Sequence, residues 1–189
     1  MRAEFLAGEE KYDGSQLVSL RSYLKHKILG DSIVAWIGPC DVSLDHMVDG
    51  EDLLENAAIR GDKMLHFIIE KFDVSLFAAV GLQRLLASIV RDRICELSTV
   101  HELTSKMIRD GDDIFSDRKK LSISIATQSP VSSLIHFAVN ITNKGTPVPT
   151  FSLEDLKLDP QVLALEVMNA FCQEVKTIHQ ATQKVRWVR

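Results

Sequence analysis

The spacing of apolar residues predicts two long helices. Between residues 75 and 97 they recur at intervals of three and four, as one face of an amphipathic helix requires. A second helix is predicted from about Pro160 to about Gln180, because Asp159 can cap it and proline suits its first position. The expected buried stripe of this last helix consists of Val167, Ala170, Phe171, Val175 and Ile178.

Other apolar runs are typical of strands. Residues 31–42, DSIVAWIGPCDV, are rich in Ile, Val and Trp, and the Gly38-Pro39 pair is expected to end the strand. Residues 64–72, MLHFIIEKF, are short and rich in Phe and Ile, which also favours a strand. Because side chains alternate between the faces of a strand, His66 and Glu70 are expected to point into the same cavity.

The clearest alternation lies in residues 120–127 and 134–141, which we interpret as two paired strands. Pairing is expected to bring His136 near Ser124 and Asn140 near Lys120. The apolar residues of both runs, beginning with Leu121 and Ile135, would then face the helices. The opposite face is expected to carry Lys120, Ser122, Ser124, His136 and Asn140.

The order of these elements predicts an α+β fold with a central antiparallel or mixed sheet and helices packed on one face. The regular strand–helix alternation and the Gly-rich turn of a dinucleotide fold are both missing from the sequence. No internal repeat, low-complexity tract or linker interrupts the chain. Residues 1–189 are therefore expected to form a single domain.

Composition narrows the classes of partner. Hydrophobic residues make up 46% and charged residues 25% of the chain, which is typical of globular proteins. The net charge of -4 argues against nucleic acid or an anionic membrane surface as a partner. Lys184, Arg186 and Arg189 surround Trp187 in a basic tail that could touch RNA. We favour the simpler expectation that Trp187 packs against the body.

The cysteines and the N-terminus indicate a cytoplasmic location. Cys40, Cys95 and Cys172 are far apart and form no CxxC pair, which argues against a disulfide framework or a zinc site. The first residues are partly acidic and contain no signal-peptide core, and no apolar run is long enough to cross a bilayer.

A face that combines one lysine with serine hydroxyls, an imidazole and an amide is suited to a carboxylate or a phosphate. The alternative is an ordinary half-exposed sheet, whose solvent face commonly carries such residues. Residues 109–126, RDGDDIFSDRKKLSISIA, resemble the segment N-D-I-x-x-x-G-R-K-[IL]-[SA]-G of biotin and lipoate protein ligases. Asp113-Ile114 and Lys120-Leu121-Ser122 carry the match.

In that ligase family the strand lysine binds the carboxylate of the acid and the phosphate of the acyl-adenylate. The resemblance thus implies this role for Lys120, and it implies that Asp113 orients Lys120 or a metal-bound phosphate. Because ligases of this fold are often dimers, it also implies a homodimer by analogy. Strings along nearly the whole chain, among them YDGSQL, GDSIVAW and KLSISIATQSPVS, are similar to domain-of-unknown-function family 366. That family is placed in the class II synthetase and biotin ligase superfamily, which implies a fold without an activity.

Two departures from the ligase pattern argue against ATP as a cofactor. Ile123 stands where the ligases have glycine, and their Gly- and Arg-rich adenylate-binding motif is missing. Two functional hypotheses follow. One is an acyl- or adenylyl-transfer enzyme that acts on a carboxylate-bearing small molecule held by Lys120, and the other is a non-catalytic ligand- or nucleotide-binding module.

Further candidates come from other segments. Gln83, on the first long helix, is a candidate substrate-binding residue, as is His66. Asp13 and Ser15 form a turn that could border the pocket. Cys40 could be a nucleophile with His66 as its base, although a small buried thiol is the commoner fate of cysteine. Histidines and carboxylates show no metal-ligand spacing, so no metal site is predicted.

Overall fold

The computed structural model describes residues 1–188, which form two sheets. The larger sheet has five strands in the order β1-β2-β3-β8-β7. Its strands are β1 (Arg2–Glu9), β2 (Ser32–Val42), β3 (Ile59–Phe72), β7 (Ser122–Gln128) and β8 (Ser132–Asn140). Because β1 runs parallel to β2 and the other neighbours are antiparallel, the sheet is mixed.

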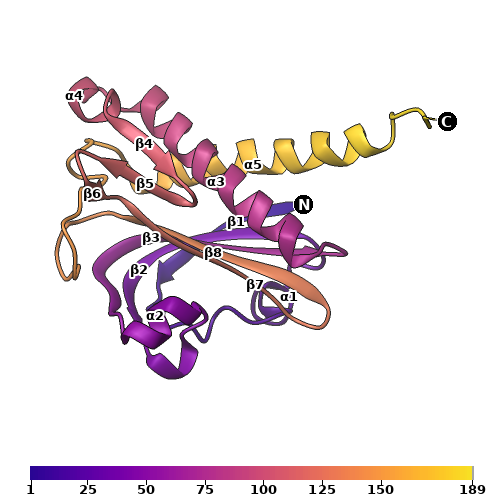
Figure 1. The fold of residues 1–189 in the computed structure, drawn as a ribbon, viewed down its shortest axis with the longest axis horizontal. Coiled ribbons are helices and arrows are strands. Elements are labelled where there is room, and N and C mark those ends of the chain that lie inside the picture. The colour runs from indigo at the N-terminus through magenta and orange to yellow at the C-terminus, as the bar shows by residue number, and fades with distance from the viewer. Residues whose placement is uncertain (189) are drawn as a thin grey trace.

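The smaller sheet has three strands and lies beside one end of the larger sheet (Figure 1). It consists of β4 (Met107–Asp110), β5 (Asp113–Ser116) and β6 (Lys119–Lys120). Asp117 and Arg118 form the tight turn between β5 and β6, with φ angles of 48° and 65°. The short helix α4 (His101–Thr104) precedes this sheet.

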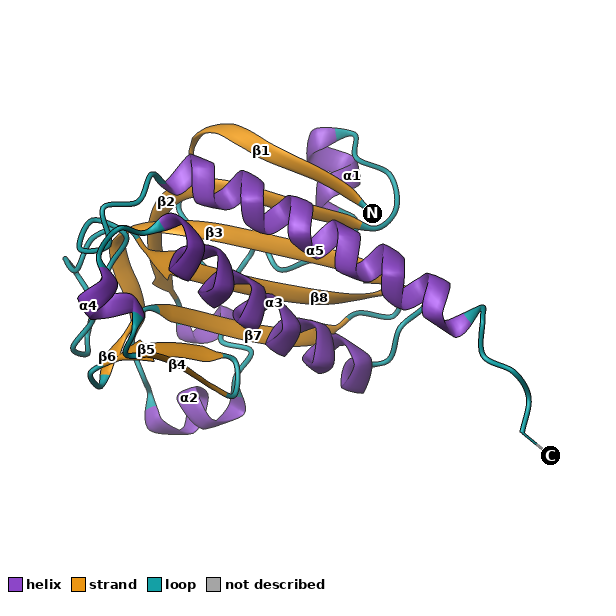
Figure 2. Cartoon of the chain, turned by 90° about the horizontal axis from the view of Figure 1, so that it is seen from above, coloured by secondary structure: helices purple, strands orange, loops and turns teal. Residues whose placement is uncertain are grey.

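Two helices cover one face of the large sheet, which we call the back face (Figure 2). They are α3 (Leu76–Leu97) and α5 (Pro160–Thr182), and Ser75 and Asp159 cap their first turns as their side-chain oxygens accept backbone N–H groups. The core beneath them includes Phe67, Phe137 and Phe171, all fully buried. The predicted fold class and both long helices are confirmed.

The opposite, front face is covered by irregular segments. The short elements α1 (Arg21–His26), η1 (Leu44–His46) and α2 (Gly50–Glu55) lie there with the loops that join them. They enclose a second cluster with a core of Tyr12, Trp36, Cys40, Met64 and Ile68. The front face is therefore largely buried, whereas an ordinary sheet surface would be solvated.

The pairing of β7 with β8 differs by one residue from the prediction. His136 is opposite Ile125, and Ser124 is opposite Phe137. Ser122 and Ser124 therefore share the back face with Val139 and Phe137, and the expectation of a front face lined by these serines is wrong. Ile123 instead packs against the front cluster. A one-residue change of register moves every side chain of a strand to the other face.

Smaller corrections concern element ends. β2 continues through Gly38 and Pro39 with an irregularity before Cys40, so this pair does not end the strand. In the stripe of α5, Val167, Phe171 and Val175 are buried but Ile178 is 44% exposed.

The C-terminal end of α5 extends beyond the sheet (Figure 2). Trp187 is 82% exposed, so the expectation that it packs against the body is wrong. Arg189, which completes the predicted basic tail, lies outside the described residues. Among the helices of residues 1–188, none has the length and apolar character to cross a membrane.

Candidate ligand-binding site

A cavity of about 320 Å³ opens on the front face, and we call it the front cavity. Several parts of the chain line it: the loop after β1, the end of β2, the η1–α2 region, the start of β3, the β4–β5 turn with β6, and strands β7 and β8. Its main polar and aromatic lining residues are Tyr12, His46, Asp49, Glu51, Asp52, Asp112, Asp113, Lys120, Ser124 and His136.

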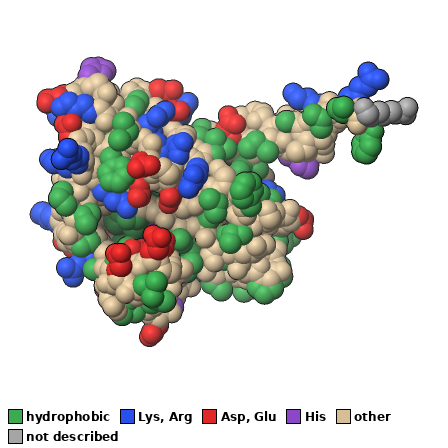
Figure 3. Space-filling view, in the orientation of Figure 1, with side chains coloured by type: hydrophobic (Ala, Val, Ile, Leu, Met, Phe, Trp, Pro, Cys, Tyr) green, Lys and Arg blue, Asp and Glu red, His purple; other side chains and the backbone are tan. Residues whose placement is uncertain are grey.

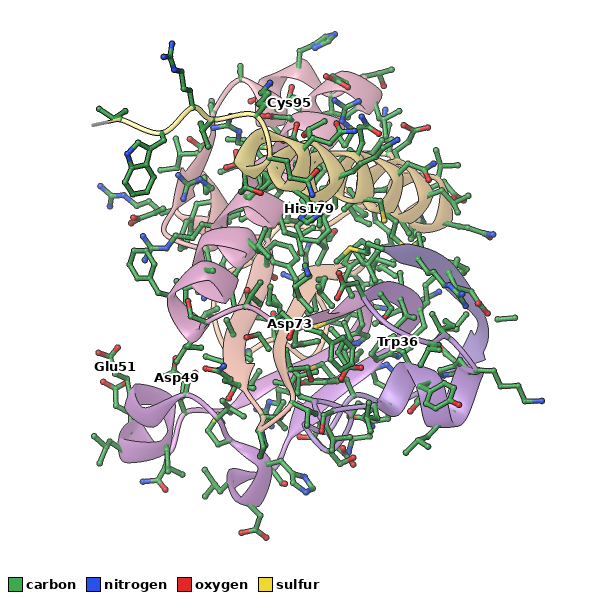
Figure 4. All side chains as sticks on the ribbon, turned by 90° about the vertical axis from the view of Figure 1, so that its right-hand side faces the viewer. Trp36, Asp49, Glu51, Asp73, Cys95 and His179 are labelled. Carbon is green, nitrogen blue, oxygen red and sulfur yellow. The ribbon has the colours of Figure 1, made fainter. Side chains whose placement is uncertain are left out.

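Carboxylates form most of the rim. Asp49 and Glu51 lie at the start of α2 (Figure 4), where Asp49 accepts N–H groups of the first helical turn, and Asp52 follows. Asp112 and Asp113 come from the β4–β5 turn on the other side. Burial, together with the neighbouring Asp49, raises the pKa of Asp52. In the space-filling view, red acidic side chains border the hollow from both sides (Figure 3).

Lys120 is the lysine of this rim, and it is already paired. Its Nζ lies 2.7 Å from Asp113 Oδ2, and both side chains are less than one-third exposed. Burial raises the pKa of Asp113, although the Lys120 ammonium acts in the opposite direction. The resemblance to ligases led us to expect Asp113 beside Lys120, and the two side chains are in contact.

Gln83 supports the rim from beneath. Its Nε2 donates to Asp112 Oδ2 at 2.8 Å and to Ser124 Oγ at 2.7 Å. Since Gln83 is 5% exposed and belongs to α3, it ties the cavity to the back-face helix. Gln83 therefore positions two lining residues and is absent from the lining itself.

The floor combines an aromatic ring with an imidazole. Tyr12 stacks on His136 with ring centroids 3.6 Å apart and planes 10° apart. Ile123 and Ile125 add apolar surface. Tyr12 was missed in the sequence because it lies in an irregular loop, far from the strand it covers.

Two buried histidines lie in line beneath the cavity. His136 Nε2 is 3.1 Å from His66 Nδ1, and His66 Nε2 is 3.1 Å from the Gly38 carbonyl oxygen. Burial lowers the pKa of His66 to about 4 and that of His136 well below its ordinary value. Both imidazoles are therefore neutral at pH 7.

The front cavity unites part of the predicted site. Lys120, Asp113, Ser124 and His136 line it, and the back-facing Ser124 does so because β7 is the edge strand of the sheet. Ser122 and Asn140 line an adjoining cavity of about 180 Å³, which also contacts Lys120.

Four predicted positions lie elsewhere. Glu70 accepts hydrogen bonds from Leu20 N and Ser132 Oγ, and neither Glu70 nor His66 lines the front cavity. The expectation that they point into one cavity is wrong, because covering segments occupy that part of the front face. Asp13 accepts from the N–H and the hydroxyl of Ser15, which is a local turn outside the cavity lining.

Cys40 is buried, and burial raises the pKa of its thiol to about 12. Because only the thiolate is a strong nucleophile, this raised pKa argues against the Cys40–His66 pair. His66 is also fully engaged by His136 and Gly38. Over residues 1–188, no group of three or more His, Cys, Asp or Glu side chains is arranged to hold a metal ion.

The model of a family described as a domain of unknown function, DUF366, matches residues 1–186. The chain belongs to this family. A solved protein of unknown function from Pyrococcus horikoshi is 38% identical to the DUF366 chain, with a TM-score of 0.89, and the match covers 100% of this chain and 99% of that one. The uncharacterized protein MJ0805 of Methanocaldococcus jannaschii is 29% identical over 187 residues, which cover 95% of this chain and 82% of the relative.

The DUF366 chain also has the fold of biotin protein ligases. The ligase of Aquifex aeolicus in complex with biotin and ATP has a TM-score of 0.59 and 13% identity, with coverage of 93% of this chain and 70% of the ligase. At this identity the likeness concerns the fold alone.

Proposed function

We propose that the DUF366 chain is a binding module for a small organic molecule that carries a positively charged nitrogen, held in the front cavity. One observation carries the proposal. Five carboxylates line the cavity, and over residues 1–188 only Asp113 among them forms an ion pair. The unpaired carboxylates are Asp49, Glu51, Asp52 and Asp112.

The charge balance favours a cation over an anion. A unit charge about 4 Å from a carboxylate interacts with it by about 1 kcal/mol in bulk water and by about 4 kcal/mol near a protein surface. The interaction is favourable for a positive charge and unfavourable for a negative one. A cationic nitrogen would gain this from several carboxylates at once. The triphosphate of ATP would meet the same carboxylates as like charges, and Lys120 already neutralises Asp113.

The volume of the front cavity and the side chains of its floor favour an organic ligand. A volume of about 320 Å³ lies at the lower end of the range for small-molecule pockets. Tyr12, Ile123 and Ile125 offer apolar and aromatic contact beneath the charged rim. The cavity therefore suits a compact apolar body with a cationic end.

The test compares two probes with the same ring, benzylamine and phenylacetate, in nuclear magnetic resonance titrations. We expect benzylamine to bind and to shift resonances of the cavity residues, while phenylacetate binds more weakly. The Asp112→Asn variant should bind benzylamine about fivefold more weakly, which corresponds to about 1 kcal/mol. The exposed Glu174 of α5 provides the control variant Glu174→Gln, with unchanged binding. Phenylacetate affinity equal to that of benzylamine would contradict the proposal.

A second candidate is acyl or adenylyl transfer to or from a carboxylate-bearing molecule. The observation that favours it is the Lys120–Asp113 pair in the cavity of a ligase-like fold. Lys120 would neutralise the carboxylate or phosphate, and fixed positive charge is a large catalytic contribution where negative charge develops. Pyrophosphate release from ATP in the presence of biotin, lipoate or amino acids, lost in Lys120→Met, would support this candidate.

A further inference from the structure

The Gly38 carbonyl oxygen determines which ring nitrogens of the two buried histidines, His66 and His136, carry a hydrogen. The Gly38 carbonyl oxygen can only accept, so His66 Nε2 carries the hydrogen of this contact. His66 is neutral at pH 7, which leaves its Nδ1 without a hydrogen. His136 Nε2 must therefore donate to His66 Nδ1.

His136 is consequently left with an unprotonated Nδ1. Its imidazole is also neutral at pH 7, because burial opposes the charged form. Over residues 1–188, the only hydrogen bond of His136's side chain is the one from Nε2 to His66. His136 is 2% exposed and lines the front cavity. Its Nδ1 has no partner among the described residues but is not sealed from solvent. Nδ1 is thus an acceptor that is accessible from the cavity and lacks a protein partner.

The surroundings keep this acceptor in place. Tyr12 stacks on the His136 ring and restricts its rotation. At the other end, Gly38 lies so close to the loop after β1 that an added Cβ would be 1.9 Å from Glu10 O. Gly38 also belongs to β2 and pairs with Met64 of β3, which holds the peptide whose carbonyl accepts from His66.

We infer that His136 Nδ1 accepts a hydrogen bond from an N–H group of the ligand, so that the cavity selects protonated amines or amidines over quaternary ammonium compounds. This inference rests on the proposed binding of a cationic molecule and narrows its chemical class. The acidic rim attracts positive charge of any kind, whereas an unpaired acceptor in a buried floor is satisfied only by a hydrogen-bond donor. A fully methylated nitrogen would satisfy the rim and leave Nδ1 without a partner.

The first experiment observes the ring nitrogens directly by ¹⁵N nuclear magnetic resonance of the ligand-free protein at neutral pH. We expect both histidines to be protonated at Nε2 and unprotonated at Nδ1. The His136→Leu variant assigns the signals. A hydrogen on Nδ1 of His136 would overturn the inference, whatever the cavity binds.

The second experiment compares benzylamine with benzyltrimethylammonium, which has the same charge and no N–H group. We expect benzylamine to bind about tenfold more tightly and to shift the His136 Nδ1 signal, as one hydrogen bond to a buried acceptor would allow. Two variants separate the acceptor from ligand size. His136→Asn can place an amide oxygen near the former Nδ1 and should retain the preference, whereas His136→Leu should lose it.

The outcomes distinguish this inference from the proposed function. Equal binding of the two cations, or a preference that survives in His136→Leu, would overturn the inference and leave the cation-binding proposal intact. Failure of both cations to bind better than phenylacetate would overturn the proposed function and the ligand class with it. If a variant fails to fold, the wild-type preference and the Nδ1 signal still decide.

Discussion

The two faces of the large sheet are covered in different ways. On the back face, the regular helices α3 and α5 bury an apolar core that includes Phe67, Phe137 and Phe171. On the front face, loops and short helices bury aromatic and polar groups together, among them Tyr12 and His136. Stability is therefore expected to depend mainly on the back face, and ligand chemistry on the front.

The largest expected effect is on the back face. Phe171→Ala should lower the free energy of unfolding by about 3 to 5 kcal/mol, because it removes a fully buried ring and leaves a cavity. Urea unfolding measures the change. Val162→Ala, at a position 50% exposed on the same helix, is the control and should change it by less than about 0.5 kcal/mol. Similar losses in both variants would contradict the assignment of the core.

The next effect belongs to the buried histidines of the front face. Burial lowers the pKa of His66 from its ordinary value of 6.5 to about 4, so between these pH values the unfolded chain binds a proton that the folded protein does not. The free energy of unfolding should therefore fall as the pH falls from about 6.5 to about 4, by about 3 kcal/mol for His66 alone. Urea unfolding at a series of pH values checks this.

Histidine variants identify the source of that pH dependence. His66→Gln should reduce the slope in this range, since only the His136 imidazole of the buried pair then remains to be protonated. His101→Asn, at an exposed position of α4, should retain the wild-type slope. A wild-type profile that is flat from pH 6.5 to pH 4 would mean that the pair is not buried in neutral form.

A smaller effect is expected at Gly38, where the front-face loop approaches the sheet. Gly38→Ala should lower the free energy of unfolding by about 1 to 3 kcal/mol, because the new Cβ would meet the backbone of Glu10. Gly81→Ala is the control. Gly81 lies in α3 with nothing within 4 Å of an added Cβ, so this change should stabilise the helix by about 0.5 to 1 kcal/mol. Thermal melts in which Gly38→Ala lowers the melting temperature and Gly81→Ala raises it would support the packing on both faces.

The difference between the faces also explains what the sequence could predict. α3 and α5 repeat their apolar residues with a helical period, and the residues of β8 were assigned to the correct faces. The side chains of β7 were assigned to the wrong faces because Ile123 and Ile125 were expected to pack against the helices. In the structure the front face is covered too, and the back-facing Ser122 and Ser124 bond to Ile114 N and Gln83.

The candidate site was harder to predict because its parts are distant in the sequence. Asp49 and Asp112 lie on opposite sides of the cavity, and neither has a motif that indicates the other. Tyr12 comes from a loop without periodicity. Lys120 and Asp113 were found through a family resemblance, whereas the excess of carboxylates around them required the fold.

The smallest change in stability is expected at Lys120, and it separates the two candidate functions. Its pair with Asp113 is partly exposed, so Lys120→Met should lower the free energy of unfolding by less than about 1 kcal/mol. The exposed Lys119 is the control, and Lys119→Met should leave stability and binding unchanged.

Binding should respond to Lys120→Met in a direction that depends on the ligand. Removing a positive charge from the cavity frees Asp113 and should tighten benzylamine binding about fivefold, equivalent to about 1 kcal/mol of Coulombic interaction. A ligand held through its carboxylate should instead lose about tenfold or more, because a charge-assisted hydrogen bond disappears. Calorimetry on the Lys120 and Lys119 variants measures both. Weaker benzylamine binding in Lys120→Met would contradict the cationic ligand, and a loss of acid binding confined to this variant would favour the transfer enzyme.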